Sequence, residues 1–412
     1  MQSNSPGMAR LGLRTALSVK FIAAFIFAAI LLPTGPVHAV NGPCCLDAQS
    51  ATITAASTNS QTLVDSGLQV TVNLPSPGAV AVFSSWGSES TTGTTRGTWD
   101  LRIDNTASCQ SVERYLSGDF DTGFGGLSYV FEGLAAGNHT VRLRHASNLH
   151  SKTLITRNAI IVAFPLTAQC GAAFNYGVAT LGPTGDESTN DGTFSAVAGI
   201  TPQVTLDVPG RIFVSAAFST DNIPPVGPST RLGAWYLTVG GAQVSTTTGR
   251  NIKGAADVAQ LDCQGLSDEL PAGTYDIQLW HASDPGIGGT KILTYNVNLL
   301  GIALSSAGGG GKILPAAKTE YEHPVLYTNS TTLTNIAESQ NDLSLAASSR
   351  IFGAATFNSV FSPPSSNPRT ASFDMQIDAV SISPTVGRDI SSSNDYGEGN
   401  LFGLSGFLGP GP

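Results

Sequence analysis

The chain has 412 residues and a formal net charge of −9, and 12% of its residues are charged. Globular proteins average about 25% charged residues, so serine, threonine, glycine and asparagine supply most of the polar surface here. The excess of acidic over basic residues argues against a nucleic-acid partner, because such proteins neutralise phosphates with a basic surface. Few charges and 46 glycines are typical of an exported β-protein with Thr- and Ser-rich strands.

Residues 1–39 have the features of an export signal. Three basic residues precede the apolar run Phe21 to Leu32, and Val37-His38-Ala39 places small residues at the two positions that a signal peptidase reads. Pro33 ends this run too early for a membrane-spanning helix, which needs about 20 apolar residues. We therefore expect cleavage after Ala39, a secreted or cell-surface location, and no membrane span in the mature chain.

The rest of the chain repeats itself at intervals of 136 to 138 residues. Trp235 to Val239 restates Trp99 to Ile103, and a third version of this strand contains Phe373 to Ile377. A period this long indicates tandem whole domains, since solenoid units recur every 20 to 50 residues or so. The sequence predicts this organisation: signal peptide 1–39, first module 40–168, second module 169–304, Gly-rich linker 305–317 and third module 318–412.

The third copy stops at Pro412, which aligns with Thr274 of the second copy. We expect it to be incomplete at its C-terminal end and to lack its last two strands. A sandwich without them has unpaired backbone edges. Either the sequence is cut short, or a strand from another subunit fills the gap.

Each copy reads as short strands separated by turn residues, without amphipathic helical periodicity. The sequence therefore predicts an all-β protein of tandem antiparallel β-sandwich or jelly-roll-like domains. Asp104-Asn105 and Gly240-Gly241 indicate hairpin turns with positive φ, whereas Asp378-Ala379 is a weaker signal because alanine disfavours that region. In the first copy we expect strands near Ala51–Ala55, Leu68–Leu74, Ala79–Ser84, Thr98–Ile103, Ser111–Leu116, Leu127–Phe131, His139–His145 and Thr153–Phe164.

Two segments shared by the first two copies carry a family resemblance. One is the pattern L-x-A-G-x-x-x-V/I-x-L, which begins at Leu134 and Leu270, and the other is the upstream strand W-x-L-x-I/V-D/G. Together they resemble the tandem β-sandwich modules of bacterial secreted and cell-surface proteins. The resemblance covers most of the first two copies and implies a fold and a location.

His145 and His281 recur at one position of the repeat, at the end of a strand. Such a histidine could act as an acid-base group or bind a ligand, or it could be hydrogen-bonded within the structure. No serine-nucleophile elbow or metalloprotease helix motif accompanies it. We favour the structural interpretation and expect no enzyme, with an extracellular hydrolase as an open alternative.

Recurring acidic and basic residues also invite a structural and a functional interpretation. Asp119 and Asp121 could hold Ca²⁺ together with backbone carbonyls, but a loop Asx-turn explains the recurrence more simply. A recurring arginine could pair with the recurring aspartate or bind a ligand carboxylate, and we favour the pairing. The two sets are Asp121, Asp257 and Asp395, and Arg114, Arg250 and Arg388.

Tryptophan and cysteine complete the candidates. Trp86, beside small polar residues, is expected in an exposed loop, where it could serve as a platform for a sugar. Export permits disulfides, so pairs within a module are the simplest expectation, and buried free thiols or an intermolecular bridge are the alternatives. The five cysteines are Cys44, Cys45, Cys109, Cys170 and Cys263.

These features predict an exported, non-catalytic protein with a binding or structural role at or outside the cell surface. An adhesin-like, coat or appendage component fits best, and its partner would be an extracellular protein, a glycan or another copy of the chain. A secreted carbohydrate-binding protein is the first alternative. No cofactor is required by any motif found.

Overall fold

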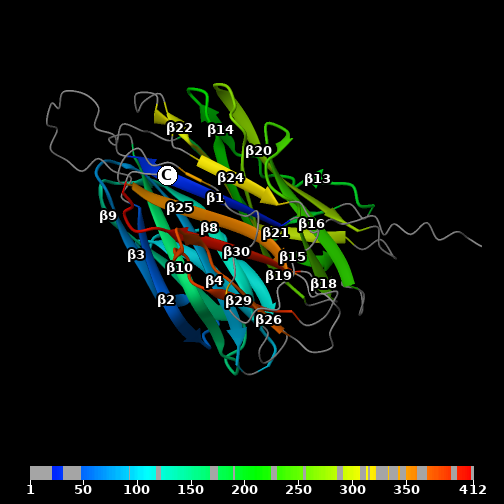
Figure 1. Ribbon diagram of the computed structural model, residues 1–412. Coiled ribbons are helices and arrows are strands. Elements are labelled where there is room, and N and C mark those ends of the chain that lie inside the picture. The colour runs from blue at the N-terminus through cyan, green and yellow to red at the C-terminus, as the bar shows by residue number, and fades with distance from the viewer. Residues whose placement is uncertain are drawn as a thin grey trace, which may run out of the picture.

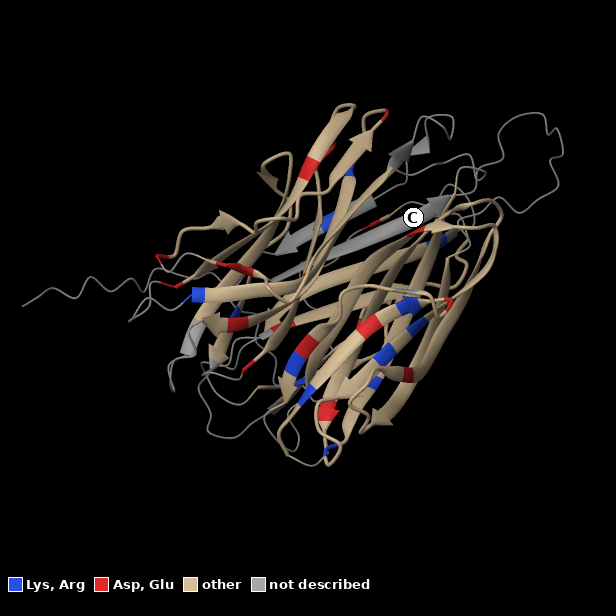
Figure 2. Cartoon of the chain, turned by 180° about the vertical axis from the view of Figure 1, so that it is seen from behind, with Lys and Arg blue, Asp and Glu red and all other residues tan. Residues whose placement is uncertain are grey.

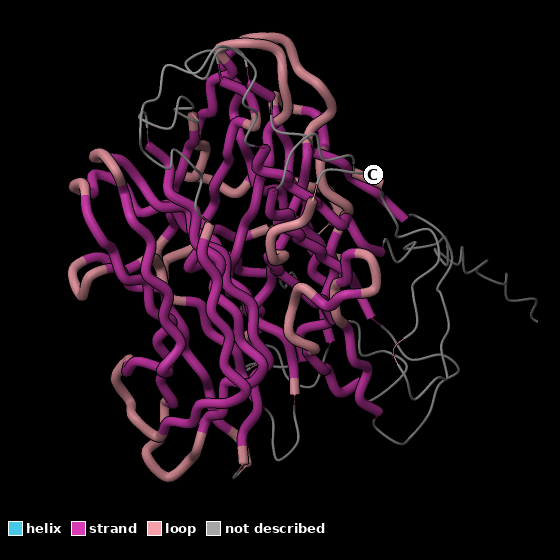
Figure 3. Tube along the Cα trace, turned by 60° about the vertical axis from the view of Figure 1, so that its left-hand side comes forward, coloured by secondary structure: helices cyan, strands magenta, loops and turns pink. Residues whose placement is uncertain are grey.

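The computed structural model describes a chain in which every described regular element is a β-strand (Figure 3). The description covers residues 21–30 and 48–409, except for residues 92, 117–121, 168–174, 189–190, 224–229, 254–256, 285–290, 307–311, 314–315, 322–332, 334–341, 344–348, 360–368 and 391–396. Within this part the predicted all-β class is confirmed, and no helix is long and apolar enough to cross a membrane.

The first module is a sandwich of two antiparallel sheets. Its inner sheet contains, in spatial order, β2 (Gln49–Thr58), β10 (Leu154–Thr167), β4 (Gly78–Ser90) and β8 (Gly123–Leu134). Its outer sheet contains β3 (Val64–Leu74), β9 (Gly137–Ser147) and β5 (Thr95–Ile103), with β6 (Ala107–Ser108) and β7 (Val112–Leu116) paired to β5. Each of the eight predicted strands overlaps one of these.

The second module repeats this arrangement. Its inner sheet contains β11 (Tyr176–Leu181), β21 (Lys291–Ala303), β15 (Ile212–Ile223) and β19 (Ala259–Leu266), with β12 (Asp186–Glu187) on β21. Its outer sheet contains β13 (Ser195–Ala196), β14 (Gln203–Leu206), β20 (Gly273–Ser283), β16 (Thr230–Val239), β17 (Ala242–Gln243) and β18 (Thr248–Lys253).

The third module has a complete inner sheet whose strands come from both ends of the chain (Figure 1). In spatial order it contains β24 (Ala316–Tyr321), β1 (Phe21–Ile30), β25 (Ser349–Ser359) and β30 (Gly397–Leu404). Two short hairpins face it, β26 (Arg369–Phe373) with β29 (Val386–Ile390), and β27 (Gln376–Ile377) with β28 (Val380–Ser381). β22 (Ser305–Ser306) and β23 (Lys312–Ile313) pair with each other on either side of the glycine run, and β24 begins inside the range expected as linker.

The three hairpin turns of the outer sheets have the backbone that the sequence indicates. Both central residues have positive φ in all three copies, including 48° and 64° for Asp378 and Ala379. Ala379 therefore lies in the left-handed region despite its β-carbon, where the second copy has Gly241.

The three inner sheets face one another across a shared apolar cluster, which we call the central core. Phe83, Phe213, Phe352 and Phe402, from all three modules, meet there. The Phe352 ring lies 4.8 Å from Phe83 and 6.3 Å from Phe213, measured between ring centroids. The inner strands are therefore buried on both faces, by the core of their own module and by the central core.

Equivalent contacts link the modules in a ring. β7 of the first module packs on β15 and β19 of the second, β18 on β25 and β30 of the third, and β29 on β4 and β8 of the first. In the first of these contacts, the backbone N–H of Tyr115 donates to the carbonyl of Val258 at 2.8 Å, and that of Glu113 donates to Ser219 Oγ at 2.8 Å. Each junction is head-to-tail, and the third returns to the first module.

Candidate functional site

Both recurring histidines lie inside their sandwiches. In the first module, Trp99 Nε1 donates to Thr156 Oγ1 at 2.9 Å, and the same hydroxyl lies 2.8 Å from His145 Nδ1. His145 is 1% exposed. Because Trp99 and His145 belong to the outer sheet and Thr156 to the inner one, the three side chains join the two sheets.

The second module contains the same arrangement. Trp235 Nε1 donates to Thr294 Oγ1 at 2.9 Å, and that hydroxyl lies 2.9 Å from Nδ1 of the fully buried His281. Burial lowers the pKa of both imidazoles to about 4, so both rings are neutral at physiological pH. Neither ring reaches solvent in the described structure, which a role in turnover of an external substrate would require.

The recurring arginines lie on β7, β18 and β29, the strands that form the junctions between modules. Arg114 Nη1 donates to Ser88 Oγ at 2.7 Å, and Arg388 Nη1 donates to Ser359 Oγ at 3.1 Å. Arg250 instead pairs with Asp257, at 3.3 Å between Nη2 and Oδ1. Asp119, Asp121 and Asp395 lie outside the described residues. Among the residues described, no three His, Cys, Asp or Glu side chains are placed to hold a metal ion.

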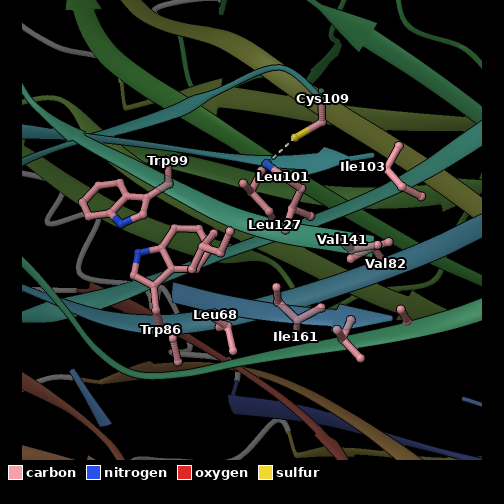
Figure 4. Packing of buried hydrophobic residues seen from close by; sticks show 14 of the residues in the cluster. Leu68, Val82, Trp86, Trp99, Leu101, Ile103, Cys109, Leu127, Val141 and Ile161 are labelled. Carbon is pink, nitrogen blue, oxygen red and sulfur yellow. Dashed lines mark hydrogen bonds between the residues drawn. The ribbon is translucent and has the colours of Figure 1, made fainter. Parts of the chain in front are cut away.

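Trp86 is not the exposed platform that its neighbours suggest. It lies in β4 with no exposed surface, and its ring centroid is 5.5 Å from that of Trp99 (Figure 4). Its cross-strand partner is Gly125, where an added β-carbon would lie 2.6 Å from the indole nitrogen. The small residues around Trp86 therefore make room for a buried ring, and they do not mark a loop.

Cys109 and Cys263 are buried free thiols, so the expected disulfides to these two residues are wrong. Burial raises the pKa of Cys109 to about 12. Its sulfur accepts a hydrogen bond from the backbone N–H of Leu101 at 3.2 Å (Figure 4). In the other modules Ser245 and Ser383 accept the equivalent hydrogen bond from a backbone N–H. Cys109 therefore takes the structural role that a serine has in the other two copies. Cys44, Cys45 and Cys170 lie outside the described residues.

A buried polar cluster lies where β8, β19 and β30 meet. Asp262 is 3% exposed and Glu398 9%, and Glu398 Oε1 accepts a hydrogen bond from the backbone N–H of Asp262 at 2.9 Å. Gln264 donates to Asn400, and within the described part of the chain Asp262 Oδ1 and Glu398 Oε2 have no hydrogen-bond partner. Burial raises the pKa of both carboxyls, and the charge of Asp262 raises that of Glu398 further. Together these groups form a polar centre between the modules.

The second module carries an aromatic patch that the sequence interpretation missed. Tyr236 and Trp280 are directly opposed on β16 and β20, with ring centroids 5.9 Å apart and ring planes within 9°. Phe194 lies 4.7 Å from Tyr236. All three side chains are partly exposed. Strand alternation could have found the pair, because the neighbouring Trp235 and His281 point inward.

The repeat does not require aromatic residues at these two positions. In the first module Asp100 and Arg144 take them, and their side chains form an ion pair at 2.5 Å. The first module thus has a charged pair at these positions, whereas the second module has two partly exposed aromatic side chains. In the second module, therefore, the core of the sandwich does not explain the aromatic patch.

Polar groups surround the aromatic patch and fix its geometry. Trp280 Nε1 donates to Thr238 Oγ1 at 3.1 Å, which orients the indole. Gln278 lies directly opposite Thr238, on the same face as Trp280, and is partly exposed. The site thus combines partly exposed aromatic side chains with a neighbouring amide, and ligand sites commonly combine apolar and polar groups in this way.

No family model and no curated protein matches the chain. Among solved structures, PNGase F, a glycosylasparaginase from Flavobacterium meningosepticum, aligns with 66% of this chain and 99% of its own, at 10% identity and a TM-score of 0.32. The CBM22-1–CBM22-2 tandem domain of Paenibacillus barcinonensis Xyn10C aligns with 62% of this chain and 91% of its own, at 9% identity and a TM-score of 0.17. At such scores the likeness carries no inference about ligand or activity.

Proposed function

We propose that the protein is an exported, non-catalytic binding protein that holds a carbohydrate on the aromatic patch of its second module. The observation that carries the proposal is the Tyr236–Trp280 pair, partly exposed at two positions where the first module has an ion pair. Pyranose rings present C–H faces that pack on aromatic rings, while their hydroxyls bond to amides such as that of Gln278.

Charge and location agree with this ligand class. The net charge of −9 argues against a polyanion, and in the view of Figure 2 the basic residues of the described chain lie among acidic ones. A neutral glycan outside the cell needs no such stripe. The export signal expected in residues 1–39 would bring the protein to that location. The buried histidines offer no support for the hydrolase alternative.

The test is binding to a glycan array by the intact protein and by a variant whose second module carries the residue pair of the first. Tyr236→Asp combined with Trp280→Arg would restore the ion pair of the first module on the same strands, so the sandwich should keep its fold. We expect this variant to lose at least tenfold in affinity for any glycan that the intact protein binds, with an unchanged melting curve.

The reciprocal change is the control. Asp100→Tyr with Arg144→Trp alters the equivalent positions of the first module and should leave the affinity of the second unchanged. Retention of full glycan affinity by the Tyr236→Asp, Trp280→Arg variant would refute the site. An array without any bound glycan would refute the ligand class.

A further inference from the structure

The third inner sheet has a strand position that is filled differently from its counterparts. In the first two modules the second strand of the inner sheet is β10 or β21, which directly follows β9 or β20 in the same module. In the third module β1 takes this position between β24 and β25, and it comes from the opposite end of the chain. We call this position the strand slot.

Pairing in the strand slot involves both neighbours. β1 pairs antiparallel with β24 from Phe21↔Tyr321 to Phe27↔Ala316, and with β25 from Ala23↔Thr356 to Ile30↔Ser349. Without a strand there, the facing N–H and C=O groups of β24 and β25 lose their partners. Such edges bind any extended segment that fits between them.

The surroundings define what fits. The equivalent strand β21 buries nearly every residue from Ile292 to Ala303, on both faces, because the inner sheet lies between two apolar cores. A segment for the strand slot must therefore be largely apolar and uncharged where it is buried. It must also lack proline where it pairs with both neighbours, because proline cannot donate to the ladder. β1, with the sequence FIAAFIFAAI, meets these conditions.

The same segment is the apolar core of the expected export signal, and its removal would open the strand slot. Every other described strand already has a place in a sheet. We propose that, once residues 1–39 are cleaved, the strand slot accepts an apolar strand from another polypeptide. The partner supplies about ten uncharged residues in extended conformation, and pairing between β24 and β25 selects them by shape and hydrophobicity.

The experiment uses the processed chain, residues 40–412, and a synthetic peptide of Phe21–Ile30 flanked by lysines for solubility. We expect one peptide to bind per chain and to raise the melting temperature by about 5 °C or more at saturation. The matched control peptide carries Phe25→Pro and Ile26→Pro. Consecutive N–H groups point to opposite neighbours, so these two prolines remove one donor toward each strand. This peptide should neither bind nor stabilise.

A second control is the unprocessed chain 1–412, whose strand slot is filled and which should not bind the peptide. Equal melting temperatures of the processed chain with and without the peptide would overturn the proposal, and so would equal binding of both peptides. Mass spectrometry of secreted protein that still contains Phe21–Ile30 would also overturn it. Glycan binding by the second module is measured separately, so either proposal can fail alone.

Discussion

The two recurring histidines show how a residue can recur because it takes part in the hydrogen bonding of the core. Each ring lies against a threonine that also accepts the indole N–H of a tryptophan. The folded pKa of about 4 lies below the ordinary value of 6.5. The folded state therefore requires neutral rings, and protonation favours the unfolded chain.

This predicts a specific acid sensitivity. Stability from the two histidines is complete above pH 6.5 and is lost as the pH falls toward 4, by about 2 kcal/mol per histidine between pH 7 and pH 5. Urea denaturation at both pH values should show that His145→Gln with His281→Gln loses clearly less stability on acidification than the unmodified protein. An equal loss in both proteins would show that the rings are not the groups that titrate.

The buried carboxyls at the meeting point of β8, β19 and β30 predict the opposite sign. Their folded pKa values are raised, so their contribution is fully present below the unfolded pKa, near 4, and falls as the pH rises. Asp262→Asn and Glu398→Gln keep the acceptor oxygens and copy the equivalent residues, Asn400 and Gln260. Each should raise stability by about 1 to 3 kcal/mol at pH 8.

Thermal melts provide the check. The gain from Asp262→Asn or Glu398→Gln should shrink as the pH is lowered from 8 and vanish below about 4, where the unmodified carboxyls are protonated in the folded and unfolded states. A gain that is independent of pH would mean that packing, and not charge, causes the effect. A loss of stability at pH 8 would mean that the carboxylates are needed as anions.

At the scale of elements, the hairpin turns allow the energy of backbone conformation to be measured without a contribution from side-chain packing. Ala379 has a φ of 64°, whereas its counterpart Gly241 has 82°, and an added β-carbon on Gly241 would touch nothing within 4 Å. We expect Ala379→Gly to stabilise the protein by about 1 kcal/mol and Gly241→Ala to destabilise it by a similar amount. Chemical denaturation of both variants tests this, and changes of the same sign would contradict it.

Strands were predictable because their signals are local. Alternation and turn residues locate eight of the nine described strands of the first module, all except the two-residue β6, and the positive φ at Asp104-Asn105 follows from residue type. The expectation for Trp86 is wrong because small residues can also make room for a buried ring, as Gly125 does here. Strand alternation predicts that Trp280 lies on the outer face of its sheet. That it forms an aromatic pair is visible only from the register, which places Tyr236 opposite it.

Contacts between modules were beyond the sequence. The repeat predicts three similar modules, but modules that are joined by linkers without packing on one another would show the same repeat. The second apolar face of the inner sheets distinguishes a ring of packed modules from separate modules. In β15 and β21 this face appears as a run of buried residues without alternation. A run without alternation shows that both faces of a strand are buried, but it does not identify what covers the second face.

The central core predicts that the molecule unfolds as one unit. Phe352→Ala removes a ring that contacts phenylalanines of all three modules, and it should cost about 3 to 5 kcal/mol. We expect a single calorimetric transition, shifted as a whole to lower temperature. Phe407→Ala, at a ring that is 63% exposed, is the control and should shift it little. Separate transitions, of which one alone moves, would show independent modules.

Because three head-to-tail junctions close the ring within one polypeptide, its three copies need not stay alike. An assembly of three identical chains would carry every surface feature three times and could bind a branched ligand with avidity. Here a single copy bears the Tyr236–Trp280 pair, and its counterpart in the first module is an ion pair. Covalent linkage has thus permitted the copies to diverge at this position. Under the proposed function, each molecule would bind one ligand at this patch, and multivalency would require several molecules.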